Sequence, residues 1–118
     1  MHKLMIFIPD PDSLPDFNDL WPNFLHQAEL LPELKRESTS HVQHVLFGSA
    51  NYSMIHELYF DTLESLQSAL ASTQGKQTAS TLHQMTRGKV TLMVADHKED
   101  DIANIRKFTP PAGANAGS

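Results

Sequence analysis

The stretch from Ile55 to Leu70, IHELYFDTLESLQSAL, changes its hydrophobic period at Asp61, and this change limits how the chain can fold. Before Asp61 a mostly apolar row alternates with a mixed row, which is typical of a half-buried strand. The apolar row is Met54, His56, Leu58 and Phe60, and the mixed row is Ile55, Glu57 and Tyr59. From Asp61, which can cap a helix with Glu64 reaching back to it, apolar residues recur at helical spacing. The stretch therefore predicts a strand that leads directly into a helix lying back on its sheet.

Other segments complete the pattern of a small mixed fold. The other expected strands are residues 3–8, 37–47 and 89–96, and the other expected helices are residues 14–31 and 76–85. Ser13 is expected to cap the first helix, and Pro22 predicts either a kink in that helix or a start near Trp21. The order β-α-β-β-α-β predicts an α+β, ferredoxin-like fold, in which the helices cover one face of a four-stranded antiparallel sheet. Two such sheets facing each other across a twofold axis would close into an α+β barrel.

The length of 118 residues allows one domain with one core. We expect the fold to occupy residues 1–96. Residues 97–118 are expected to be a partly flexible extension, because the composition there shifts to charged residues and then to Pro, Ala and Gly. Residues 109–118 should be a mobile tail or an arm that packs on a partner. A monomer of this size buries only about two thirds of its unfolded surface, so self-association is also expected.

Charge and composition exclude several classes of partner. Lys and Arg number 9 against 14 Asp and Glu, so no basic surface for nucleic acid or anionic lipid is expected. The apolar runs are much shorter than the roughly 20 residues that span a bilayer, and Pro9 interrupts the first run too early for a signal peptide. A cytoplasmic location is therefore the default expectation. The absence of cysteine excludes disulfides, thiolate metal sites and cysteine nucleophiles.

Four segments of the chain resemble the EthD family of the dimeric α+β barrel superfamily. They are KLMIFI at residues 3–8, LPEL at 31–34, IHELYFDTLESLQSALAS at 55–72 and RGKVTLMVA at 87–95. The resemblance extends over residues 1–96 and is more specific for the fold than for any chemistry. EthD-like chains commonly carry a His-x-Pro-Leu element in the first helix. That position here reads Phe24, the nearest histidine is His26 and the nearest proline is Pro22, so the family's histidine cannot be transferred to this chain.

The resemblance implies a homodimer whose facing sheets enclose a cavity for a small apolar or aromatic molecule. Relatives include monooxygenases of antibiotic biosynthesis that work without metal or flavin, and muconolactone-type isomerases, so no cofactor is expected. The implied function is an oxidoreductase-type or proton-transfer enzyme, or an accessory to one, in a degradation or biosynthetic pathway. The alternative is a non-catalytic protein that binds such a molecule or assists a partner oxygenase.

The candidate catalytic residues are Glu57, Tyr59 and His41. If Leu58 and Phe60 face the helices, Glu57 and Tyr59 face the cavity, where a carboxylate could relay a proton and a phenol could hold the substrate. The alternative for Glu57 is an ion pair with Lys or Arg. His41 would reach the cavity only if its face of the strand points inward. The sequence contains no nucleophile elbow, phosphate loop or dinucleotide fingerprint.

The candidate ligand-binding residues lie on the first helix and on two strands. They are His26, Trp21, Phe24, Ile55 and Met93. Aromatic residues at helical spacing more often belong to the core, which is the alternative for Trp21 and Phe24. His56 is expected to be a buried histidine hydrogen-bonded to the first helix. No metal site is expected, because His41 and His44 would point to opposite faces of a strand.

Overall fold

A computed structural model describes residues 1–102 of the chain, and residues 109–118, for which a tail or arm is expected, lie outside that range. The elements are β1 (His2–Ile8), the short 3-10 helix η1 (Pro11–Ser13), α1 (Phe17–Glu29), β2 (Arg36–His41), β3 (Met54–Phe60), α2 (Leu63–Ala71), α3 (Thr73–Thr86) and β4 (Thr91–Asp96). This order confirms the predicted α+β, ferredoxin-like fold, in which the helix expected after β3 is α2 and the helix expected at residues 76–85 is α3. No helix of the described part is long and apolar enough to cross a membrane.

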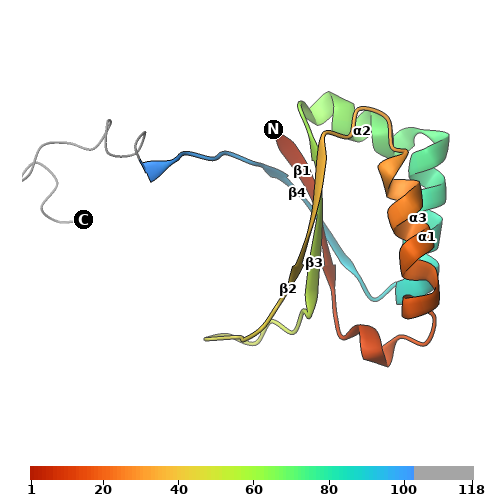
Figure 1. Cartoon of the computed structure of the whole chain (residues 1–118), viewed down its shortest axis with the longest axis vertical. Coiled ribbons are helices and arrows are strands. Elements are labelled where there is room, and N and C mark those ends of the chain that lie inside the picture. Colours follow the sequence, from red (N-terminus) through yellow and green to blue (C-terminus); the bar gives the residue numbers. More distant parts are fainter. Residues whose placement is uncertain (103–118) are drawn as a thin grey trace, which may run out of the picture.

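The four strands form one antiparallel sheet in the order β2-β3-β1-β4. All the longer helices lie against the same face of this sheet, and the opposite face carries no helix (Figure 1). We call these two faces the helix side and the open face. Cross-strand partners share a face. Leu4 is paired with Leu58 and Val94 on the helix side, and Met5 is paired with Glu57 and Met93 on the open face.

The hydrophobic core lies between the helix side and the helices. Its strand residues include Leu4, Ile6, Ile8, Met54, Leu58 and Phe60, and its helix residues include Phe17, Phe24, Ala28, Leu66, Leu82 and Met85. Burying one large apolar side chain contributes about 1.5–3 kcal/mol. The alternation of β1 and β3 therefore fixes which side chains turn toward the helices and which turn toward the open face.

The capping residues predicted from the sequence differ from those that begin the helices in the structure. The first helix begins at Phe17 after Asp16, so both a cap by Ser13 and a start near Trp21 are wrong, and Pro22 lies inside α1. Ser13 instead ends η1 and donates its hydroxyl to the Asp10 carbonyl at 2.7 Å. The cap of α2 is not Asp61 but the next residue, Thr62, whose hydroxyl oxygen accepts the amide of Ser65 at 3.0 Å.

The second strand is shorter than the sequence pattern predicts. It ends at His41, after which the Val42 amide still donates to the Ser53 carbonyl at 2.9 Å. Residues 43–51 pair with no strand of the described chain, because β3 begins only at Met54 and leaves them without a partner. The segment between β2 and β3 projects from the sheet on the side opposite the helices (Figure 1).

The corner between α2 and α3 depends on Gly75. Ser72 ends α2 and caps α3, accepting the Gly75 amide on its hydroxyl oxygen at 3.0 Å. Because α3 turns back so closely, a Cβ atom at position 75 would overlap the carbonyl oxygens of Ala69 and Leu70. Both oxygens belong to the backbone and cannot move without opening the corner.

We predict that Gly75→Ala destabilises the protein by about 1–3 kcal/mol, the usual cost of overpacking. In an unobstructed helix the same change would stabilise by up to about 1 kcal/mol, so the sign of the effect reports the close approach. Urea unfolding of the two proteins at one concentration measures the difference. Ser80→Ala, at an exposed site of the same helix, is the control and should change stability by less than about 0.5 kcal/mol. A more stable Gly75→Ala variant would contradict the prediction.

Candidate functional site

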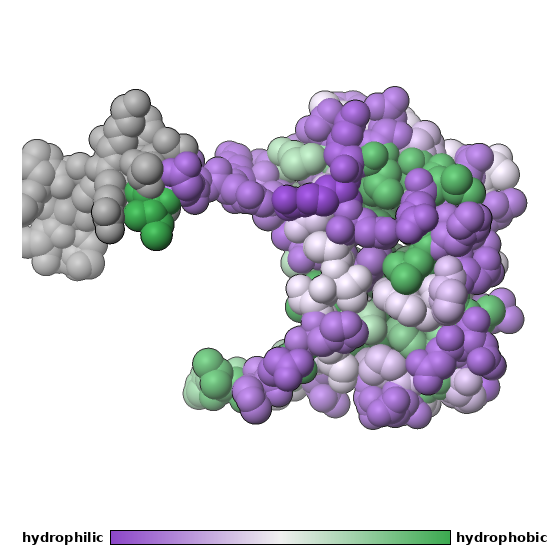
Figure 2. All heavy atoms as spheres, in the orientation of Figure 1, coloured by the Kyte–Doolittle hydropathy of each residue, from purple (hydrophilic) through white to green (hydrophobic). Residues whose placement is uncertain are grey.

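Four of the predicted site residues lie together on the open face. Ile55, Glu57 and Tyr59 alternate along β3 on that face, and Met93 of β4 lies beyond Met5 in the same row as Glu57. Figure 2 shows the open face as the inner side of a hollow, with the chain after β4 projecting above it and the segment between β2 and β3 projecting below it. The structure therefore brings together the strand residues that the sequence grouped by alternation.

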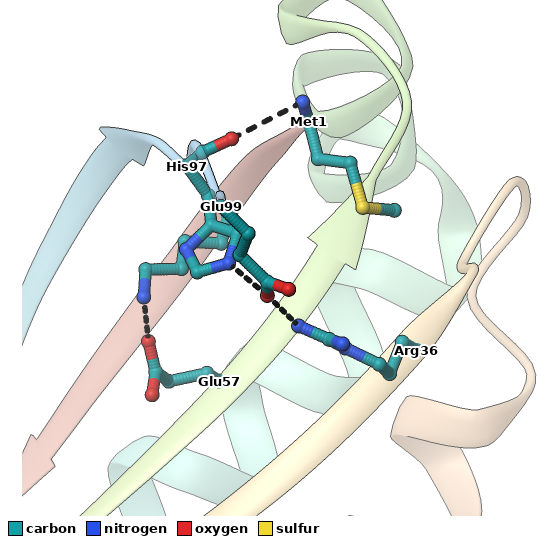
Figure 3. Close-up of polar contacts among 6 residues, drawn as sticks. Met1, Arg36, Glu57, His97 and Glu99 are labelled. Carbon is teal, nitrogen blue, oxygen red and sulfur yellow. Dashed lines mark hydrogen bonds and ion pairs between the residues drawn. The ribbon is translucent and has the colours of Figure 1, made fainter. Parts of the chain in front are cut away.

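Glu57 forms an ion pair with Lys3 of β1, which is paired with Tyr59 and so lies diagonally across from Glu57 (Figure 3). Both side chains are mostly buried in the single chain. The pairing with a basic residue was the alternative to a free base. The Lys3 ammonium group therefore occupies the Glu57 carboxylate, and a substrate would have to displace Lys3 before it could reach that carboxylate.

Tyr59 is enclosed by charged and aromatic groups and is only 4% exposed. The Arg36 guanidinium lies over its ring at 4.1 Å from the centroid, and the His97 ring meets it edge-on at 5.1 Å. Glu99 holds this cover together, because it accepts from Arg36 at 3.0 Å and contacts His97 Nε2 at 2.6 Å (Figure 3). The contacts from His97, then Arg36, lower the pKa of the Glu99 carboxyl. The segment after β4 thus folds over the upper part of the open face.

A second site lies between the helices and the sheet. It is a pocket with a volume of about 160 Å³ and walls that are almost wholly apolar. The lining residues are Leu4, Ile6, Phe24, Leu31, Leu58, Leu70, Gly75, Thr78, Ala79, Leu82 and Leu92. Thr78, the one lining residue with a polar side chain, donates its hydroxyl to the Gln74 carbonyl at 2.7 Å. The walls therefore present no free side-chain donor to a bound molecule.

His56 is fully buried, but it is bonded to β2 and not to the first helix, as the sequence led us to expect. Its Nε2 lies 2.9 Å from a Glu37 carboxylate oxygen, which can only accept, so Nε2 carries the proton. Desolvation lowers the pKa of the His56 imidazole, against the opposing effects of Glu37 and Glu57, so the ring is neutral and Nδ1 accepts from the Thr39 hydroxyl at 2.8 Å. These bonds join the edge strand β2 to the core.

The remaining predicted residues do not join the open face. His41 is paired with Met54, which places it in the helix-side row, so the strand face that carries it does not point inward and the condition for its reaching the cavity is not met. Trp21 stacks between Phe17 and Phe24 in the helix layer, and Phe24 lines the pocket. His26 is exposed on α1. Within residues 1–102, no group of three or more His, Asp or Glu side chains is placed to hold a metal ion.

The pocket between the helices and the sheet was not predicted from the sequence. The sequence signal was in α3, where the buried Gly75 and Thr78 face the large side chains of the sheet and the exposed Ala79 also lines the pocket. Small residues on the inner face of a helix leave space unless a neighbouring side chain fills it. Whether one does depends on how α2 and α3 meet, and sequence spacing alone does not specify that angle.

Solved structures share this fold. An EthD family protein from Bacillus halodurans C-125 has a TM-score of 0.73 at 22% identity, covering 83% of this chain and 99% of its own. A dimeric ferredoxin-like protein of unknown function from Jannaschia sp. CCS1 has a TM-score of 0.62 at 13% identity, over 81% and 97% of the two chains. SnoaB, a cofactor-independent oxygenase from Streptomyces nogalater, has a TM-score of 0.58 at 11% identity, over 84% and 93%.

The predicted resemblance is thus confirmed at the level of the fold. The sequence matches no family model and no curated protein.

We predict that His56 makes the protein less stable in acid. Its folded-state pKa lies below the ordinary value of 6.5, so the unfolded chain binds a proton that the fold disfavours. The contribution of His56 to the free energy of unfolding is fully present above pH 6.5. It decreases as the pH falls from 6.5 toward the folded-state pKa, by at most about 1.4 kcal/mol per pH unit.

Urea unfolding at about pH 7.5 and about pH 5.5 measures this slope. His56→Gln should show a smaller loss between the two pH values than the wild type. His26→Gln, at an exposed position, should keep the wild-type slope and serves as the control. Equal slopes for the wild type and His56→Gln would exclude His56 as the cause.

Proposed function

We propose that this chain binds a small, uncharged, apolar molecule in the pocket between its helices and its sheet. The observation that carries the proposal is the pocket's lining, which offers apolar side chains and a Thr78 hydroxyl already used within α3. Apolar cavities of about 150 Å³ in proteins stay dry and bind molecules such as benzene. A volume of about 160 Å³ therefore suits one aromatic ring or a short branched hydrocarbon.

A charged or strongly polar ligand does not fit these walls. Burying a hydrogen-bonding group without a partner costs several kcal/mol, and the lining supplies no side chain to offset that cost. Of the lining residues, Leu70, Ala79 and Leu92 are exposed to solvent, and we infer that the pocket opens among them. The pocket selects by size and apolarity.

We further propose that two copies pair through their open faces as an EthD-like α+β barrel. Helices cover only one face of the sheet, and the open face carries apolar side chains around the Lys3–Glu57 pair, including Met5 and Met93. Structural neighbours described as dimeric share the fold, which supports this arrangement. Sedimentation at micromolar concentration should give a dimer, and a stable monomer would contradict the pairing.

A second candidate is a cofactor-free, oxidoreductase-type or proton-transfer enzyme. It is favoured by the position of Glu57 beside the buried Tyr59 on the open face, which the second copy would shield from water. An oxygenase described as cofactor-independent shares the fold, which supports this candidate. In it, Glu57 would take a proton from an apolar substrate after leaving Lys3, and Tyr59 would orient that substrate once Arg36 and His97 had moved off its ring.

For the binding function, we predict saturable binding of toluene to the full chain, followed by amide shifts in two-dimensional NMR. Ala79→Phe places a ring in the pocket and should weaken binding at least about tenfold, equivalent to about 1.4 kcal/mol. Ser80→Phe adds the same ring at the next position of α3, which does not line the pocket, and should bind as the wild type does. No saturable shift in the wild type, or equal loss in both variants, would contradict the proposal.

For the enzymatic candidate, we predict that the protein accelerates the ring opening of 5-nitrobenzisoxazole, a carbon acid that reports proton removal by a base. Glu57→Gln should lower this rate about 100-fold or more, the usual contribution of a positioned base. Absorbance of the released phenolate measures it. Glu64→Gln changes an exposed carboxylate on α2 and should leave the rate unaltered. Equal rates for Glu57→Gln and the wild type would remove Glu57 as a base.

A further inference from the structure

Large exposed hydrophobic side chains of the described chain gather in two places. One group lies between β2 and β3 and consists of Val42, Val45, Leu46 and Phe47. The other lies along β4 and at the pocket, and consists of Leu70, Leu92, Met93 and Val94. Exposed apolar groups of this kind commonly mark surfaces that another molecule covers in the functional complex. Their positions relative to one another indicate what covers them.

The first group forms the tip of the segment 42–51, which we call the arm. Leu46 is 95% exposed and Phe47 is 98% exposed, so neither packs on its own chain. Figure 2 shows this apolar tip standing out from the sheet on the side of the open face. Beyond the arm, at its foot, Tyr52 is fixed by a hydrogen bond to Thr91 at 2.9 Å and by ring contact with Phe7 at 5.2 Å. The arm thus rises from an anchored base.

Three residues of the second group, Leu92, Met93 and Val94, lie on β4 at the opposite edge of the sheet. Leu92 and Val94 point to the helix side, since they are paired with Ile6 and Leu4, yet they are 51% and 52% exposed. Leu92 also lines the pocket, where it stands near the partly exposed Leu70. The helices therefore leave one edge of the core, and the entrance of the pocket, uncovered.

The arm of the same chain does not cover this edge. Two strands separate β2 from β4, and the arm leaves on the open face whereas Leu92 and Val94 point to the helix side. A second copy removes both obstacles. A twofold axis parallel to the strands reverses the edge order of the second sheet, so β2 of one copy lies opposite β4 of the other.

A twofold axis parallel to the strands also leaves positions along the strands unchanged, so corresponding ends of the two sheets lie next to each other. The arm leaves at the end of the sheet marked by the Ile8–Met54 pair, and β4 starts at that end, where Thr91 is paired with Phe7. The arm of one copy is then directed past the β4 edge of the other, close to Leu92. Each copy gives one arm and receives one, which satisfies the symmetry of a closed dimer.

We propose that in the dimer the arm of each chain folds around the β4 edge of the second copy, and that Leu46 and Phe47 cover Leu92 and Val94 there. This contact closes the entrance of the pocket, so each ligand site is completed by the other chain. The inference rests on the proposed pairing through the open faces and on the proposed ligand pocket. It adds the residues by which one copy controls access to the site of the other.

A disulfide tests the contact directly, because the natural chain contains no cysteine. The full-length double variant Phe47→Cys/Leu92→Cys is oxidised and analysed by non-reducing electrophoresis and peptide mass mapping. Disulfides join residues only when their Cα atoms come within about 7 Å. We expect a covalent dimer linked through positions 47 and 92. Phe47→Cys/Ser80→Cys, with its second cysteine on the outer side of α3, is the matched control and should stay unlinked.

The cross-linking experiment has three informative outcomes. A dimer joined at 47 and 92 supports the proposal. A monomer with the same link inside one chain would overturn it, since the arm would then cover its own β4 edge. A sedimenting dimer without the link would also overturn it while leaving the paired open faces intact, and another segment would have to cover Leu92.

A second pair of variants measures what the arm contributes. Leu46→Ser/Phe47→Ser should raise the dimer dissociation constant and weaken toluene binding, each at least about tenfold. Leu30→Ser, which removes an exposed leucine outside both groups, should change neither. Unaltered dimerisation and toluene binding in the arm variant would overturn the proposal. If wild-type protein binds no toluene while the 47–92 link forms, the pocket function fails and the arm contact stands.

Discussion

Burial of one face of the sheet under the helices is the constraint on which the other features of this protein depend. The alternation of β1 and β3 sends Leu4 and Leu58 into the core, and the same alternation forces Lys3, Glu57 and Tyr59 to the opposite face. A strand offers no third direction. The polar groups of the open face are therefore a geometric consequence of the core, and their pairing with one another reduces the cost of placing charge on a partly buried surface.

The edge strand β2 is held by a different kind of contact. His56 stands in the apolar row of β3 at a position where a hydrocarbon would pack, and it bonds both Glu37 and Thr39 of β2. A buried imidazole that lost either partner would leave a polar atom unsatisfied, so these bonds specify the register of the edge strand. Of the described residues, none in the segment 42–51 bonds its side chain to β3 in this way, and there the chain leaves the sheet and forms the arm.

The helix layer covers the sheet incompletely, and the pocket follows from that. Gly75 allows α3 to turn back tightly on α2, while Thr78 and Ala79 present little volume toward the sheet. The space that remains is lined in part by Leu92 of β4, which is half exposed. The proposed ligand site and the proposed dimer contact thus share one origin, which is the incomplete cover of the β4 edge by the helices.

The sequence by itself determined the order of the elements, the fold class and the division of β3 into a core row and an open-face row, because hydrophobic period and side-chain alternation are local properties. For the same reason Ile55, Glu57 and Tyr59 were predicted to share one face of β3, whereas the register of β1 and β4 places Met93 in their row. Tertiary structure alone decided the rest. Strand register decides that Lys3 is the partner of Glu57 and that His41 lies on the helix side. The angle between the packed helices decides that a pocket remains beneath them. These depend on contacts between residues far apart in the chain, which no local pattern encodes.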